Sequence, residues 1–276
     1  MTRTDIIKEL ERRGYKAECR NSIKNGIIFE GIVIGKAQIA PIIYTKNLIE
    51  DAEKSGKSVY KVATEIIEIC EQNGDKEISL ELLTSREFFL KHVNVGIQRK
   101  SNEDIEKQNC EFDLDELESY LFIKYKYANS DGAGCMKIND YFLKQVGVSR
   151  LEAWETAKWN VCKDTVIKSF DQIMAEAFGM PYDPDAEPSV PLYVITNSDC
   201  IKGASTILNR EKLKEFGKKH DTDKILVLPS SINEMLIVPY QDWMDLDSMK
   251  CLVQEVNVTE VLPEERLIDK AYIMEL

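Results

Sequence analysis

Histidine is scarce in this sequence, since His92 and His220 are the only two among 276 residues. A charge-relay site needs a histidine, or a lysine in its place, beside the nucleophile. His220 lies in the polar segment KKHDTD, where a cation suits a helix end, and His92 lies between a predicted helix and a predicted strand. We therefore expect structural or surface roles for both, and no histidine-rich metal site.

Closely spaced cysteines are lacking as well. The chain has seven cysteines, and the two nearest, Cys110 and Cys135, are 25 residues apart. This spacing excludes a C-x-x-C zinc or redox motif. We expect seven free thiols in a reducing compartment, the cytoplasm.

Long apolar runs are missing too. No run approaches the roughly eighteen consecutive apolar residues that a membrane-spanning helix needs. The N-terminal segment MTRTDIIKELERRG is charged and has no apolar core of the signal-peptide type. We expect a cytoplasmic protein that does not bind membranes.

Runs of basic residues with interleaved aromatics, which are typical of nucleic-acid binding, do not occur. Residues 221–276 carry twelve acidic and four basic side chains, a net charge of −8 out of the chain's −12. Such an acidic surface repels phosphate backbones. The expected partner is therefore an unidentified protein or small molecule, and not nucleic acid.

The glycine loops of nucleotide-binding proteins are absent from the sequence. Two loops contain glycine among small residues, Asp131–Gly134 and Gly203–Thr206, and neither matches G-x-x-x-x-G-K-[ST] or G-x-G-x-x-G. The second loop lies between a predicted strand and a predicted helix, where backbone N–H groups can meet an anion. A plain turn is the favoured interpretation of both, and we predict no cofactor.

The patterns of apolar residues that are present indicate a mixture of helices and strands. Near the N-terminus they predict a helix at 4–13 capped by Thr4, a hairpin at 16–34 that turns at Asn25-Gly26, a strand at 37–44 and a helix at 58–70. Farther along they predict helices at 80–90, from Ser149 onward, at 171–178, 211–219 and 248–256, and strands at 93–97, 118–127, 135–138, 192–196, 224–228 and 233–239. The resulting fold class is α+β, with mainly antiparallel sheets covered by helices in two packed lobes.

Proline marks the predicted boundary between the lobes. Four of the eight prolines fall within Pro181–Pro191, which cannot form a helix and is a poor strand. We predict an N-terminal α+β lobe at residues 1–180, a proline-rich linker at 181–191 and a C-terminal α+β lobe at 192–276.

Carboxylates gather in two groups in the last lobe. The groups are Asp242, Asp245 and Asp247, and Glu264, Glu265 and Asp269. General acid/base or metal chemistry would need two of them to converge with a third from elsewhere. Helix capping is the simpler interpretation, because Asp245 and Asp247 directly precede the predicted helix at 248–256.

The best candidate for a ligand site is the loop from Pro229 to Glu234, between two apolar strands. The candidate ligand-binding residues are Ser230, Ser231, Asn233, Glu234 and, from the helix that follows, Asn257. Such a loop lies at the end of a sheet, where ligands often bind. A serine nucleophile would need a base, and no histidine or lysine is near in sequence. The alternative is that these polar groups satisfy the backbone of the turn itself.

Several segments resemble an uncharacterised family of gut-dwelling clostridial bacteria, catalogued only as a domain of unknown function. The matching segments are Leu192–Asn197, Gly203-Ala204, Leu228–Glu234, the strand ending at Pro239, Glu255–Asn257, Thr259, Val261, Pro263–Glu265 and Gly31–Tyr44. Ile268 stands where the family pattern has a serine, while Asp269 and Tyr272 remain. The resemblance implies a fold and a cytosolic bacterial setting, and it implies no activity.

These observations favour a non-enzymatic binding or regulatory protein. The scarcity of histidine and the lack of cofactor and paired-cysteine motifs carry this hypothesis. The alternative is a hydrolase or transferase that uses carboxylates together with Ser230, Ser231 or Asn233.

Overall fold

The structure is a computed structural model that describes residues 1–35, 42–73, 80–111, 114–126, 133–184, 186 and 188–276. Contacts within the chain divide it into two compact units. The first unit comprises Met1–Phe88 with Lys124–Cys135, and the second comprises Phe89–Ile123 with Met136–Leu276. Helices and antiparallel sheets make up both parts, which confirms the α+β fold class.

The first unit begins with a helix and a hairpin. Its elements are α1 (Arg3–Arg12), β1 (Ala17–Lys24), β2 (Ile27–Ile34), β3 (Ile43–Tyr44), α2 (Lys46–Ser55), α3 (Val59–Asn73) and α4 (Leu80–Leu83), and α5 (Arg86–His92) leads into the second unit. Thr2 caps α1 in a capping box with Asp5, so the predicted cap at Thr4 is wrong. The helix needed an extended residue before its first turn, and Thr2 has that conformation.

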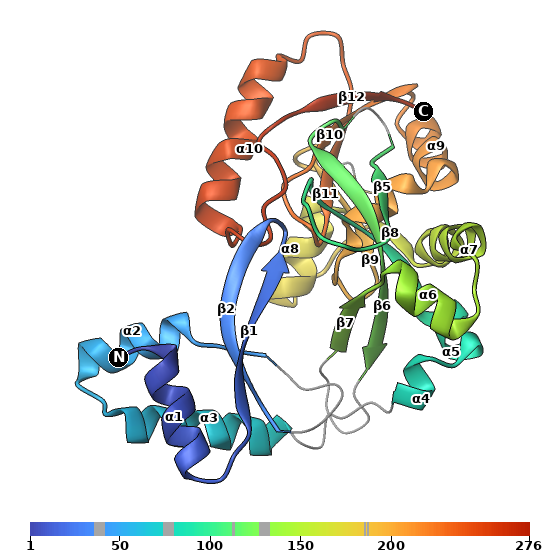
Figure 1. The fold of residues 1–276 in the computed structure, drawn as a ribbon. Coiled ribbons are helices and arrows are strands. Elements are labelled where there is room, and N and C mark those ends of the chain that lie inside the picture. The colour runs from blue at the N-terminus through green and yellow to red at the C-terminus, as the bar shows by residue number, and fades with distance from the viewer. Residues whose placement is uncertain (36–41, 74–79, 112–113, 127–132, 185, 187) are drawn as a thin grey trace. The chain divides into compact units, whose positions relative to one another are not determined.

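The predicted hairpin is confirmed. β1 and β2 pair antiparallel, and Asn25 and Gly26 turn the chain with φ angles of 49° and 79°. β2 lies between β1 and β3, so it is not an edge strand, as its apolar sequence predicts. Figure 1 shows α1 and α3 side by side, and Ile6, Leu10 and Val62 share one buried core there.

Other predictions in this region were wrong or lie mostly outside the described residues. The single helix predicted at 80–90 is wrong, because the chain forms α4 and α5 with a break at Thr84 and Ser85. Serine and threonine compete with the helix for backbone hydrogen bonds, which favours such a break. Most of the strand predicted at 37–44 and of the loop Ala128–Gly134 lies outside the described residues.

The second unit contains most of a sheet centred on β6. This sheet joins β4 (Val93–Arg99), β6 (Leu117–Lys126) and β5 (Lys107–Asn109), and β7 (Ala133–Lys137) also pairs with β6. Two helices follow it, α6 (Asp140–Val146) and α7 (Arg150–Lys163). Asn139 and Ser149 cap them by accepting from backbone N–H groups three residues on.

A five-stranded antiparallel sheet forms the rest of the second unit, in the order β12-β10-β11-β9-β8. Its strands are β8 (Thr165–Ser169), β9 (Tyr193–Asn197), β10 (Lys224–Leu228), β11 (Met235–Pro239) and β12 (Tyr272–Glu275), and its other elements are α8 (Phe170–Phe178), the 3-10 helix η2 (Gly203–Leu208), α9 (Arg210–Lys219) and α10 (Leu246–Glu260). The sequence patterns missed β8, whose five residues lie directly between two helices.

The segment Pro181–Pro191 connects α8 to β9, and β9 pairs with β8 in the same sheet. The division into residues 1–180, 181–191 and 192–276 stays a prediction, because compactness alone does not decide which segments fold independently.

Helix α10 covers part of this sheet, as its apolar stripe predicts. Val253 and Met249 pack against Leu226 and Leu228 of β10. Asp245 caps the helix by accepting from the N–H groups of Asp247 and Ser248, so the capping interpretation is confirmed for Asp245. The side chains at positions 252 and 256 lie outside the described ones.

Candidate functional site

The loop predicted as a ligand site is tightly held between two other segments. Ser230 and Ser231 are only 3% and 2% exposed. The backbone N–H of Leu267 donates to the Ser230 carbonyl at 3.0 Å, and the N–H of Ile232 donates to the Glu265 carbonyl at 2.8 Å. This burial supports a structural contribution from both serines.

Asn233 ties the loop to the segment that follows β9. Its side-chain Oδ1 accepts from the backbone N–H of Lys202 at 3.1 Å, and its backbone carbonyl accepts from Thr196 Oγ1 at 2.7 Å. Its own N–H donates to Ser231 Oγ at 3.0 Å. One amide side chain therefore sets the position of Lys202.

Gly203 lies so close to the strand β9 and to the loop at Asn233 that no side chain fits there. A Cβ atom there would lie 2.3 Å from Thr196 Oγ1, 2.6 Å from the Asn233 carbonyl oxygen and 2.8 Å from the Asn197 nitrogen. No side chain fits at these distances. Three of the segments that carry the family resemblance thus meet at one place: the strand ending at Asn197, the Gly203 turn and the loop ending at Glu234.

Lys202 itself has a left-handed backbone, with φ at 52°. For a lysine this conformation costs about 1–2 kcal/mol relative to the right-handed one. Its Nζ donates to the hydroxyl of Tyr120 at 3.0 Å and lies 5.7 Å from the centre of the Tyr120 ring. Strain of this kind concentrates at functional sites, where the surrounding structure imposes it.

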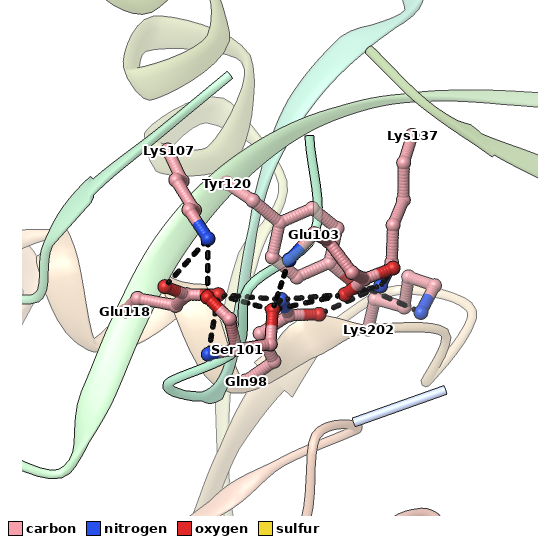
Figure 2. A network of polar contacts seen from close by, with 8 residues as sticks. All are labelled: Gln98, Ser101, Glu103, Lys107, Glu118, Tyr120, Lys137 and Lys202. Atoms are coloured by element: carbon pink, nitrogen blue, oxygen red, sulfur yellow. Dashed lines mark hydrogen bonds and ion pairs between the residues drawn. The ribbon is translucent and has the colours of Figure 1, made fainter. Parts of the chain in front are cut away.

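Tyr120 is the centre of a larger group of polar side chains, which we call the polar cluster (Figure 2). Its members are Gln98, Ser101, Glu103, Lys107, Glu118, Tyr120, Lys137 and Lys202. Gly96 faces Tyr120 across the β4–β6 ladder, and a Cβ atom on it would lie 2.5 Å from the tyrosine ring. The missing side chain at Gly96 therefore makes room for Tyr120, which is 1% exposed.

A second ammonium group approaches the same ring. Lys137 Nζ lies 5.1 Å from the centre of the Tyr120 ring, and donates to both oxygens of Glu103 at 2.6 and 2.7 Å and to Gln98 Oε1 at 2.8 Å. Burial lowers the pKa of Lys137, Glu103 opposes this shift, and the charge of Lys202 adds to it. The two ammonium groups thus repel each other across one site.

The other end of the polar cluster is dominated by Glu118. Gln98 Nε2 donates to Glu118 Oε1 at 2.7 Å, and Ser101 Oγ donates to the same oxygen at 2.9 Å. Lys107 forms an ion pair with Glu118 at 3.6 Å. Figure 2 shows Lys107 and Glu118 at one end of the cluster and Lys137 and Lys202 at the other. The cluster holds three cationic and two anionic side chains.

Glu234 and Asn257 have different hydrogen-bond partners. Burial raises the pKa of Glu234, a hydrogen bond from Ser231 opposes the shift, and the charge of Glu265 adds to it. Asn257, 1% exposed, donates from Nδ2 to Asp269 Oδ1 at 2.7 Å. No interaction within the described part of the chain joins Asn257 to the loop. Its buried Oδ1 has no hydrogen-bond partner there either.

The remaining candidate groups have structural surroundings. The ring of His220 packs 4.4 Å from that of Phe216, and burial lowers the pKa of His220. All seven cysteines are free, and burial raises the pKa of Cys110 to about 11, so this thiol is not activated. Gly203–Thr206 is buried within η2. Asp131–Gly134 lies partly outside the described residues.

Neither a metal-ligand cluster nor a membrane-spanning helix occurs among the described residues. No group of three or more His, Cys, Asp or Glu side chains is placed to hold a metal ion within these ranges. Over the same part of the chain, no helix has both the length and the apolar character to cross a membrane.

Sequence reasoning missed the polar cluster, whose members come from β4, the loop after it, β5, β6, β7 and the residue before η2. One signal was available: Gln98 and Glu118 are polar residues within mainly apolar strands, and they face each other in the β4–β6 register. Paired polar residues inside strands can mark a buried network.

Comparison with known proteins places the chain in a family. No curated protein and no solved structure matches it. A family described as being of unknown function, DUF5688, matches residues 2–275. The expected resemblance to a domain family of unknown function is thus confirmed, and the chain belongs to the DUF5688 family.

Proposed function

We propose that this protein is a non-enzymatic binding protein, and that it holds a small ligand bearing a carboxylate or phosphate group at Lys202 and Lys137. One observation carries the proposal: a lysine held in a strained backbone conformation places its ammonium group against a buried tyrosine that a second lysine also approaches. An anion between the two ammonium groups would relieve their repulsion and accept charge-assisted hydrogen bonds from both.

Both lysines are accessible enough to meet a ligand. The side chain of Lys137 is 21% exposed, and Lys202 is half-buried. The partial burial strengthens an ion pair relative to one on the open surface. Tyr120 adds a hydroxyl group at the same place.

Composition argues against a nucleic-acid partner and supports a cytoplasmic location. The net charge of −8 on residues 221–276 disfavours nucleic acid, and the free cysteines favour a reducing compartment. The family resemblance supports a bacterial source. The proposal specifies only the anionic group of the ligand. Any regulatory role depends on which ligand binds.

Calorimetric titration with inorganic phosphate and with citrate at constant ionic strength tests the proposal. We expect saturable binding by the natural sequence and at least a five-fold loss of affinity in Lys202→Met. Lys144→Met is the matched control, because that side chain is 74% exposed on α6, outside the polar cluster. Equal affinity in all three proteins, or no binding of either anion, would contradict the proposal.

Lys202→Gly separates binding from folding. Glycine adopts a left-handed backbone without the cost that lysine has there. We expect this variant to unfold cooperatively at a temperature close to that of the natural sequence, and to bind phosphate as weakly as Lys202→Met.

A second candidate function rests on Glu234. A carboxylate whose pKa is raised by burial is a better base, and Ser231 is its hydrogen-bond partner. This pair supports a hydrolase that uses Ser231 as its nucleophile, although Ser231 is 2% exposed. Hydrolysis of p-nitrophenyl esters that is lost in both Ser231→Ala and Glu234→Gln would favour the enzyme over the binding protein.

A further inference from the structure

The second unit contains a pocket that shares no residue with the polar cluster. Its volume is about 270 Å³, and it lies beside β8, α9 and the segment after α8. Residues that line it include Tyr182, Tyr193, Lys212, Phe216, Lys219 and His220. We call it the aromatic pocket.

Three rings form one wall of the aromatic pocket. The ring centres of Tyr193 and Phe216 are 4.8 Å apart, those of Phe216 and His220 are 4.4 Å apart, and those of Tyr193 and His220 are 4.9 Å apart. The rings pack at angles of 48–79° to one another, an arrangement that aromatic pairs favour. Burial lowers the pKa of His220, which keeps its imidazole neutral at neutral pH. A wall of this kind suits the face or edge of a planar apolar ring.

Charged residues of α9 also line the pocket. Lys212 pairs with Glu215 at 3.3 Å, and both residues line the pocket. Lys219 also lines it, and no carboxylate among the described residues forms an ion pair with Lys219. A cation therefore stands beside the aromatic wall.

The volume sets the size of a ligand. A cavity of about 150 Å³ holds benzene, and pockets for drug-sized molecules begin at about 300 Å³. At about 270 Å³ the aromatic pocket has room for one ring or two fused rings with a small substituent.

We infer that the aromatic pocket binds a small planar aromatic carboxylate, with its ring against Tyr193 and Phe216 and its carboxylate at Lys219. This site is independent of the one at Lys202 and does not rest on the proposed function.

Titration with 2-naphthoate and with neutral 2-naphthamide, followed by calorimetry on the full chain, tests this inference. The natural sequence should bind 2-naphthoate saturably. Lys219→Gln should weaken 2-naphthoate binding about five-fold and leave 2-naphthamide unchanged. Lys218→Gln is the matched control, because Lys218 is the exposed neighbour on α9 and does not line the pocket.

Phe216→Leu tests the aromatic wall while filling most of the same space. It should weaken both probes at least three-fold, provided that thermal unfolding remains cooperative. If unfolding is not cooperative, Tyr182→Leu, at a partly exposed position, takes its place with the same expected loss. No saturable binding of 2-naphthoate by the natural sequence would overturn the inference. Binding that neither substitution weakens, or equal affinity for the two probes, would overturn it as well.

Discussion

Replacement of Gly203 by alanine tests how the polar loop and Lys202 are held together. The new Cβ atom would lie 2.6 Å from the Asn233 carbonyl oxygen and 2.8 Å from the Asn197 nitrogen, both backbone atoms. These contacts are shorter than side-chain carbons tolerate, so one of the two segments must move. The Thr196 hydroxyl, which donates to the Asn233 carbonyl, lies only 2.3 Å from the new atom.

The expected loss of stability is about 2–4 kcal/mol. Overpacking a buried site costs about 1–3 kcal/mol, and loss of the hydrogen bond from Thr196 adds about 0.5–1.5 kcal/mol. For a chain of this size, we expect the melting temperature to fall by about 4–16 °C. Denaturant unfolding followed by circular dichroism measures the free energy directly.

Gly147→Ala is the control for this substitution. Gly147 ends α6 with φ at 67°, and no atom lies within 4 Å of the place where a Cβ would be. Alanine there has an unfavourable backbone conformation but no steric clash. That cost is about 1–2 kcal/mol, reduced by the lower entropy of the unfolded alanine chain. If Gly203→Ala lowered the free energy of unfolding by no more than Gly147→Ala does, close packing of the three segments would be refuted.

Three further predictions concern other parts of the chain. The raised pKa of Glu234 means that its charge lowers stability as the pH rises above about 4.5. The unfolding free energy of Glu234→Gln should therefore equal that of the natural sequence at pH 4 and exceed it at pH 7. An equal or lower value at pH 7 would contradict the burial of this carboxylate. Thiol titration in denaturant should detect all seven cysteines. Under native conditions Cys110 should be among the slowest thiols to react, because its pKa is about 11. A stable disulfide would contradict the expected reducing compartment. Deletion of residues 248–276 removes β12 and most of α10, so the product should bind a hydrophobic dye and lack a cooperative melt; a soluble, cooperatively melting product would show that this segment is peripheral.

Features that depend on neighbouring residues could be predicted from the sequence. The Asn25-Gly26 turn was one, because only a few residue pairs favour two positive φ angles in succession. The cap of α10 by Asp245 was another, since the capping oxygen and the N–H groups it accepts from lie within three residues. The loop at Ser230–Glu234 was also found, because turn residues between apolar runs mark a sheet end.

Features that depend on distant residues could not be predicted. Lys202 and Tyr120 are 82 residues apart, and their contact needs a left-handed lysine and a glycine opposite the tyrosine. Neither requirement leaves a motif in the sequence. The hydrogen bond from Asn257 to Asp269 could not be predicted either, because the direction of the Asn257 side chain depends on how α10 packs.

The position of a bound anion tests the central claim most directly. Crystals grown with selenate, analysed by anomalous scattering from selenium, would show where an anion binds. The account predicts a peak within hydrogen-bonding distance of both Lys202 Nζ and Lys137 Nζ, beside the Tyr120 hydroxyl. Selenate found only elsewhere on the protein, with these two ammonium groups bound to no anion, would contradict it.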